Sequence, residues 1–475
     1  MPVLIKQYKF AERIGFSMEE IEVIVEKISQ LLTDKKYREL KDILSELEPA
    51  DVAIVFEELP KKSMPILFRL LAKEQAAEVF VELDSDMQEM LISEFSDYEL
   101  KEVLEELYLD DTVDIIEEMP ANVVRRILRH SDADTRQNIN NILKYPKDSA
   151  GSIMTIEFVD LKKDMTVEDA FIRIRRRGVD KETIYTCYVI DENRILLGLV
   201  SVKDLLLAEQ NQVIEDIMEQ NIIYVNTLDD KEYAAQAFEK YDFLALPVVD
   251  KENRLVGIIT VDDAIDVLQE EATEDIEKMV AITPTDKPYM KTGVIETFQK
   301  RIPWLLLLMI LSALTSGIIS LFEESLSVCV VLTAFIPLLM GTGGNSGGQS
   351  SATIIRSMSL GDVEMSDVLK VLWKELRVAF ICGVVLAVAN FVKVMIVDST
   401  NIVASGYSPV LIASVVSLSL LVTVVIAKLI GCVLPMLAKK IGFDPAVMAS
   451  PLITTIVDTV SLMVFFNIAV MILHI

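Results

Sequence analysis

Asp458 is the residue whose type and surroundings point most directly to chemistry. It is the only Asp, Glu, Lys or Arg in the 31-residue apolar stretch 445–475. A carboxylate near the middle of a membrane costs about 2.5–3.5 kcal/mol on insertion scales, and such residues usually serve a function. We interpret Asp458 as an ion site in a transport path, with Thr454 one helical turn before it. The alternative is a structural ion pair with Lys393 or Lys428.

A glycine-rich segment, 337–349, is the second candidate. Its five glycines within eight positions weaken a helix by roughly 1 kcal/mol each relative to alanine. Glycines spaced four apart, beginning at Gly343 and Gly344, permit close helix packing, which is the simpler interpretation. Packing does not require Asn345 or Gln349. These amides favour a pore wall, where bare backbone and polar side chains face water.

A third candidate is an acidic stripe in the segment 262–277, where eight of sixteen residues are acidic. On a helix, five of them fall within an arc of about 80°: Asp263, Asp266, Glu270, Glu274 and Glu277. Such a stripe is usually a solvated face. We expect it to lack lysine partners one turn along, so that its carboxylates repel, by roughly 4 kcal/mol at 4 Å and an effective dielectric of 20. A divalent cation between them would remove that repulsion.

The scarcity of other metal ligands narrows the choice of cation. The chain has two histidines and four scattered cysteines, at 187, 329, 382 and 432. Metal chemistry must therefore use oxygen ligands, which suit hard cations such as Mg²⁺ or Ca²⁺. Mg²⁺ gives up its water reluctantly, which fits a site with one carboxylate per chain.

Charge and apolar residues are segregated along the 475-residue chain, whose net charge is −28. Residues 300–475 hold ten basic and nine acidic residues, which leaves 35 basic and 64 acidic residues in the first 299. The acidic balance argues against a nucleic-acid partner, since phosphate binding needs a basic face.

The apolar part predicts five transmembrane helices, because about 20 apolar residues cross a bilayer. The expected spans are 302–322, 325–355, 371–397, 399–427 and 445–475. Basic residues gather before the first helix and in the loops after the second and fourth. By the positive-inside rule, the N-terminal half is cytoplasmic and the C-terminus lies outside.

The soluble part begins with helical repeats. A 24-residue period relates the segments 55–59, 79–83 and 103–107, which predicts a small superhelical all-α domain. Asp110 and Asp114 lie in it. Taken alone, the cluster 110–114 predicts a solvated helix start.

Residues 150–268 contain a different duplication. The segment Val189–Asp204 is echoed by Val248–Asp263, and each copy alternates apolar strands with helices. This α/β arrangement resembles a tandem CBS-domain pair. In that family a Gly-x-x-Ser/Thr-x-x-Asp stretch often contacts a nucleotide ribose. Ser201 with Asp204, and Thr260 with Asp263, match that stretch, but CBS pairs can also be purely structural.

The order of these parts, from about Leu31 to Ile475, resembles the MgtE-type magnesium transporters. The resemblance implies a homodimeric, lipid-embedded Mg²⁺ channel of the plasma (inner) membrane, closed by cytoplasmic Mg²⁺. Its pore would follow helices two and five, with Asp458 holding hydrated Mg²⁺ beside Gly343, Gly344 and Asn345. Some members bind ATP in the CBS pair. The implied regulatory Mg²⁺ ligands are Asp110, Asp114, Asp230, Glu232, Glu239, Asp242, Asp263, Asp266, Glu271, Glu274 and Asp275.

The expected organisation is multidomain. Its parts are an N-terminal extension (1–20), an acidic helical-repeat domain (21–148), two CBS units (149–210 and 211–269), a connecting or plug helix (270–299) and a five-helix membrane domain (300–475). We find no enzyme motif. Three alternatives remain: a membrane-anchored nucleotide sensor without transport, a carrier instead of a channel, and a transporter of another divalent cation such as Co²⁺ or Ni²⁺.

Overall fold

The computed structural model describes residues 18–285, 289, 292–448 and 450–474. The chain forms two compact units, Met1–Val267 and Leu268–Ile475, and each is described by itself. Most of the expected N-terminal extension, residues 1–17, lies outside the described residues, and so does Ile475.

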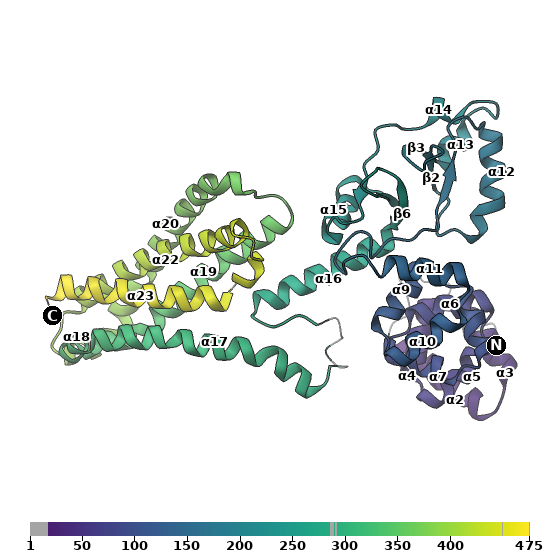
Figure 1. Cartoon of the computed structure of the whole chain (residues 1–475). Coiled ribbons are helices and arrows are strands. Elements are labelled where there is room, and N and C mark those ends of the chain that lie inside the picture. The colour runs from purple at the N-terminus through teal and green to yellow at the C-terminus, as the bar shows by residue number, and fades with distance from the viewer. Residues whose placement is uncertain (1–17, 286–288, 290–291, 449, 475) are drawn as a thin grey trace. The chain divides into compact units, whose positions relative to one another are not determined.

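The first unit begins with a layered array of short helices (Figure 1). Val55 and Phe56 on α4, and Val79 and Phe80 on α6, are all buried at equivalent positions of the 24-residue period. Alternate helices pack in succession, α4 on α6, α6 on α8 and α8 on α10, which confirms the superhelical prediction. The helices are α2 (Met18–Thr33), α3 (Tyr37–Leu44), α4 (Pro49–Glu58), α5 (Met64–Phe68), α6 (Lys73–Glu82), α7 (Ser85–Glu94), α8 (Asp97–Leu104), α9 (Leu109–Glu118), α10 (Ala121–His130) and α11 (Ala133–Ile142).

Two small sheets of identical topology follow. In each, the first and second strands are parallel and the second and third antiparallel, in the orders β1-β2-β3 and β4-β5-β6. Both second strands shift register at matching points, Val189/Ile190 and Val248/Val249, which confirms the α/β duplication. The elements are β1 (Val159–Leu161), α12 (Val167–Arg177), β2 (Thr186–Ile190), β3 (Leu196–Ser201), α13 (Val202–Leu207), α14 (Ile214–Ile217), β4 (Val225–Asn226), α15 (Lys231–Tyr241), β5 (Ala245–Val249), β6 (Leu255–Thr260) and α16 (Val261–Met279).

Each CBS unit packs a methionine against a glycine in the sheet of the other unit. A Cβ built at Gly198 of β3 would lie 2.7 Å from the Sδ of Met218, and one at Gly257 of β6 would lie 2.7 Å from the Sδ of Met154. Each methionine enters a gap that only glycine leaves, on the copy to which it does not belong. This reciprocal packing gives the same role to the two methionines, each of which follows an isoleucine in the sequence (153–154 and 217–218).

The second unit contains five helices that are long and apolar enough to span a membrane, as expected. The fourth span differs from its predicted bounds, because it begins at Pro409 and runs through Lys428 to Lys440. Gly406, with φ +83°, terminates the preceding helical segment, so residues 399–404 belong to the end of the third span. The helices are α17 (Val294–Leu321), α18 (Glu323–Val328), α19 (Ile336–Ser359), α20 (Val368–Lys393), α21 (Ser399–Ala404), α22 (Pro409–Lys440) and α23 (Ser450–Leu473).

Candidate ion sites

Asp458 lies on α23, where this helix packs against the glycine segment of α19. A Cβ built at Gly344 would lie 2.7 Å from Cγ2 of Thr454 and 3.5 Å from Oδ1 of Asp458, so glycine lets the carboxylate approach the α19 backbone. The Oδ1 atom is buried and has no hydrogen-bond partner in the part of the chain that the structure describes. A buried, unsatisfied carboxylate oxygen is costly unless a ligand completes it.

Neither lysine considered as a partner reaches Asp458. The Nζ of Lys393 forms an ion pair with Oδ2 of Asp398 at 2.7 Å. Lys428, buried on α22, donates to Oγ of Ser350 on α19 at 3.3 Å, and Ser350 donates to Oε2 of Glu375 on α20 at 2.8 Å. The unexplained charge of Lys428 is therefore linked to Glu375 through a serine, because a buried cation requires hydrogen-bond acceptors.

The glycine segment presents two different faces. Gly343, Gly344 and Gly347 are buried against α22 and α23, and a Cβ at Gly343 would lie only 2.7 Å from Oγ of Ser461. Asn345 and Gln349, one turn apart, are exposed. Close packing and polar exposure thus occupy opposite faces of one helix. Exposed amides at membrane depth are costly in lipid, so this face suits water or a second polar surface.

In the first unit, carboxylates from the repeat domain and the CBS pair gather around Asp110. This residue, near the start of α9, is only 7% exposed, so the expectation of a solvated helix start is wrong here. Burial and the negative charges of Asp263, Glu182 and Asp111 raise the pKa of Asp110 well above its usual value. The helical array brings α9 against the loops of the CBS pair, which the local sequence pattern does not reveal.

Its neighbours are perturbed in the same direction. Burial, with nearby negative charges, raises the pKa of Asp111 to about 6, that of Asp263 to about 7 and that of Glu182 to about 8. Glu182 Oε2 is buried and, among the described residues, has no hydrogen-bond partner. The sequence did not identify Glu182, Asp111, Asp262 or Glu157 as members of the cluster. For Glu182 the reason is that the loop that carries it has no periodic signal.

This cluster has the composition of a hard-cation site, since all its donors are carboxylate oxygens. Within the described ranges, however, no three His, Cys, Asp or Glu side chains converge closely enough to hold a metal ion. A cation placed among these groups would stabilise their ionised forms against burial and mutual repulsion. Asp114 is exposed and is not among the charges that perturb Asp110.

Four predicted ligands lie at the two ends of α15. Asp230 caps its N-terminus, where Oδ1 accepts from the backbone N–H of Glu232 at 2.8 Å. Asp242 caps its C-terminus in a left-handed conformation, with the exposed Glu239 in the last turn. An 11-residue helix is about 16 Å long. One ion bound by a single chain therefore cannot contact both pairs.

The acidic stripe continues along α16, with Asp266 exposed. The expectation that it lacks lysine partners is wrong for Glu274, whose Oε1 pairs with Nζ of Lys278 at 2.6 Å. The same Nζ lies 2.7 Å from Oδ2 of Asp444, in the segment after α22. Burial, followed by the charge of Asp444, raises the pKa of Asp275. Glu271 is half-buried and lies between Asp266 and Glu274 along the same helix.

The two matches to the ribose-binding stretch share a hydrogen bond from the hydroxyl group to the carboxylate. Ser201 caps α13, accepting from the Asp204 N–H at 3.1 Å and donating to the Asp204 carboxylate. Thr260 donates to Oδ2 of Asp263 at 2.6 Å. Their surroundings differ, because only Asp263 takes part in the carboxylate cluster.

Comparison with known proteins agrees with this architecture. The family model described as a divalent cation transporter matches residues 336–468, the MgtE intracellular N domain matches 47–148, and the CBS domain matches 150–211 and 214–270. Together with the five apolar helices, these matches define a multi-pass membrane protein of the divalent-cation transporter class and not an enzyme.

Full-length relatives specify the family. The chain is 36% identical to the magnesium transporter MgtE of Thermus thermophilus, over 95% of this chain and 99% of the relative, and 33% identical to that of Bacillus subtilis, over 95% and 98%. A solved structure of the soluble part of a magnesium transporter is 30% identical, with a TM-score of 0.50, and covers 53% of this chain and 100% of that one. The chain belongs to the MgtE family.

Proposed function

We propose that the protein is a Mg²⁺ channel for magnesium uptake across the plasma membrane, closed by Mg²⁺ bound to its cytoplasmic carboxylates. The observation that carries the proposal is the buried Oδ1 of Asp458 beside Gly344, which has no hydrogen-bond partner within the described ranges. A lone carboxylate at membrane depth suits a cation that keeps most of its water. The magnesium transporters matched over nearly the whole chain supply the identity of the cargo.

The polar, exposed face of α19 supports the proposal of a homodimeric pore. Asn345 and Gln349 are exposed in one copy of the chain, although they lie at membrane depth. A second copy facing this helix would enclose a polar path lined by amides and by Asp458. The distribution of basic loops supports a cytoplasmic N-terminal half and an external C-terminus.

The electrostatic repulsion within the carboxylate clusters supports the proposal that Mg²⁺ closes the channel. Each ion stabilises the closed state only by its differential affinity for it, so several ions acting together give steep closure. The proposed ligands of the regulatory ions are the eleven carboxylates that the family resemblance implies. We also propose the domain boundaries expected from the sequence. Glu274 differs from the others, because Mg²⁺ there must compete with Lys278.

Of the two motifs that match the ribose-binding stretch, only one has surroundings that favour ATP. At Thr260 and Asp263 a triphosphate would add negative charge to the carboxylate cluster of Asp110 and Glu182, whose members already raise one another's pKa. Asp204 is outside that cluster and lies next to Lys203. We therefore assign nucleotide binding to Ser201 and Asp204, and cation binding to Asp263.

Flux into liposomes tests the transport proposal. We expect Mg²⁺ uptake by the purified protein at low internal Mg²⁺, suppressed as internal Mg²⁺ rises. Asp458→Asn keeps the shape but removes the charge, so uptake should fall about 10- to 100-fold, as loss of a contact to a charged group of about 1.5–3 kcal/mol implies. Asp398→Asn is the matched control, since Asp398 is paired with Lys393.

The outcomes separate the alternatives. Equal uptake by Asp458→Asn and the intact protein would exclude Asp458 as the ion site. No uptake by folded, intact protein, together with nucleotide binding, would favour the sensor without transport. Uptake of Co²⁺ in preference to Mg²⁺ would change the cargo and leave the path intact.

A further inference from the structure

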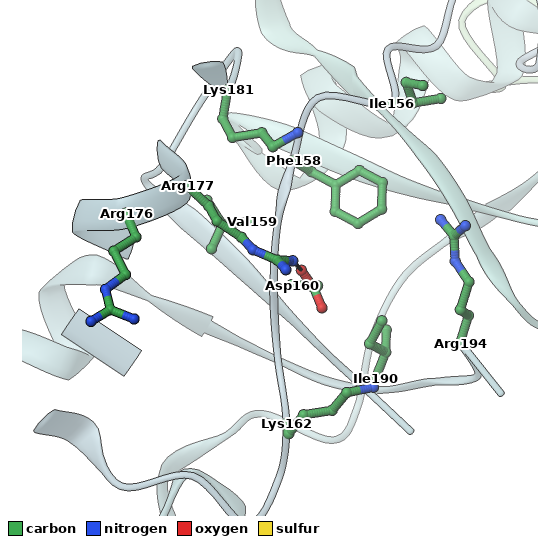
Figure 2. A pocket seen from close by; sticks show the side chains of 10 residues that line it. All are labelled: Ile156, Phe158, Val159, Asp160, Lys162, Arg176, Arg177, Lys181, Ile190 and Arg194. Atoms are coloured by element: carbon green, nitrogen blue, oxygen red, sulfur yellow. Dashed lines mark ion pairs between the residues drawn. The ribbon is translucent and has the colours of Figure 1, made fainter. Parts of the chain in front are cut away.

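The first CBS unit contains a basic cavity of about 530 Å³ beside the edge strand β1. Figure 2 shows Lys162, Arg177, Lys181 and Arg194 around the strand that carries Val159 and Asp160, with Arg176 farther out at the rim. Five cationic side chains and one carboxylate line it. Such a concentration of positive charge is unusual in a chain whose net charge is −28.

The carboxylate does not neutralise this lining. Asp160 is paired with Arg173, which is outside the cavity, and lies 3.6 Å from Nη1 of Arg177. Arg176, Lys181 and Arg194 have no ion-pair partner among the residues that the structure describes. Unpaired like charges around one cavity repel, and an anion between them removes that cost.

The size and floor of the cavity define the ligand further. A water molecule occupies about 30 Å³ of liquid, so the cavity exceeds the size of a simple inorganic ion and falls in the range of about 300–1,000 Å³ for small-molecule sites. Phe158 and Ile190, both buried, form an apolar floor. Guanidinium and ammonium groups on several sides suit several phosphate groups, which accept paired N–H donors.

Two of the five cations that line the cavity are specific to the first unit. By strand register, Lys162 corresponds to Asn226 and Arg194 to Asn253 in the second unit, so neither cation is repeated. The cavity also lies apart from Ser201 and Asp204, because β1 and β3 are opposite edges of the sheet. The basic lining is therefore neither a requirement of the CBS fold nor part of the nucleotide motif.

We propose that this cavity binds a small molecule carrying two or more phosphate groups, at a site separate from the Ser201/Asp204 motif. The proposal does not depend on the transport activity. Pyrophosphate and ATP share the required chemistry, and the test below distinguishes them.

Calorimetric titration of the full-length protein in detergent and Mg²⁺-free buffer tests the site, with pyrophosphate as the probe. We expect pyrophosphate to bind, more weakly at high salt. The double variant Lys181→Gln, Arg194→Gln should lower its affinity at least tenfold, the equivalent of about 1.4 kcal/mol. Lys163→Gln is the control and should leave pyrophosphate binding unchanged, because Lys163 is paired with Glu215 and does not line the cavity.

No pyrophosphate binding to the intact protein, or equal binding by the double variant, would overturn the proposal. ATP titrated into the same proteins and into Asp204→Asn identifies the natural class. ATP affinity lost in the double variant and kept in Asp204→Asn would assign the nucleotide to this cavity. Loss in Asp204→Asn alone, with pyrophosphate still sensitive to Lys181 and Arg194, would establish two separate sites. Thermal melting of each variant confirms that the fold is intact.

Discussion

The two CBS units share one backbone and differ in charge. Their strand order, register shift and hydroxyl–carboxylate pair are the same. Residues 149–210 nevertheless carry nine basic against eleven acidic side chains, whereas residues 211–269 carry four against thirteen. The first unit contains the basic cavity, and the second contributes Asp263 to the carboxylate cluster. The shared motif therefore fixes the local turn, while neighbouring charges decide which ligand each unit can accept.

The largest expected effect is loss of Mg²⁺-dependent stabilisation when the acidic cluster is neutralised. A ligand at 100 times its Kd stabilises a protein by about 2.7 kcal/mol. Mg²⁺ should raise the thermal midpoint of the intact protein, followed by circular dichroism. The Asp110→Asn, Asp263→Asn double variant should lose most of that rise, and Asp204→Asn should keep it. An equal rise in all three proteins would remove the distinction between the two units.

The affinity for ATP tests whether the first CBS unit, and not the second, binds the nucleotide. Removing a hydrogen bond to a charged group costs about 1.5–3 kcal/mol, so Asp204→Asn should weaken ATP binding by about tenfold or more. Asp263→Asn should leave it unchanged or improve it, because one repelling charge is removed. Fluorescent-nucleotide displacement measures both. Weaker binding in Asp263→Asn would place the nucleotide in the second unit.

The pH dependence of stability should report on the carboxylate cluster, to which the first CBS unit contributes Glu182 and the second contributes Asp263. The pKa of Glu182 rises from 4.5 to about 8 and that of Asp263 from 3.8 to about 7. Between these limits the folded protein binds more protons than the unfolded chain, so its free energy of unfolding falls as the pH rises. Urea unfolding without Mg²⁺ at pH 5 and pH 8 should show this fall. Glu182→Gln should reduce it, and Asp204→Asn should not.

The smallest effect concerns the capping hydroxyls. Ser201→Ala should destabilise by about 1 kcal/mol through loss of the cap. Thr260→Ala should cost more as the pH rises, since Thr260 donates a hydrogen bond to the ionising carboxylate of Asp263. Urea unfolding at the two pH values measures both. An equal cost of Thr260→Ala at both pH values would show that the hydrogen bond to Asp263 does not depend on ionisation of that carboxyl group.

The fold was predictable because it is repetitive. The 24-residue period places Phe56 and Phe80 in the same layer of the core, and the duplicated segments specify the two sheets. Asp458 was predictable because it is the only Asp, Glu, Lys or Arg in a long apolar stretch. The cluster around Asp110 was not, because Glu182 and Asp263 are brought together by packing between distant segments. The start of the fourth span was also misplaced, since apolar composition does not reveal the turn at Gly406.

The reciprocal methionine contacts bear on whether one CBS unit could stand alone. Met218 fills the gap over Gly198, and Met154 fills the gap over Gly257, so each copy is completed by a residue from the other. A chain with only one copy would leave its own gap open and its methionine without a receptacle. Neither CBS unit is therefore fully packed by itself, and the two copies depend on each other through these contacts.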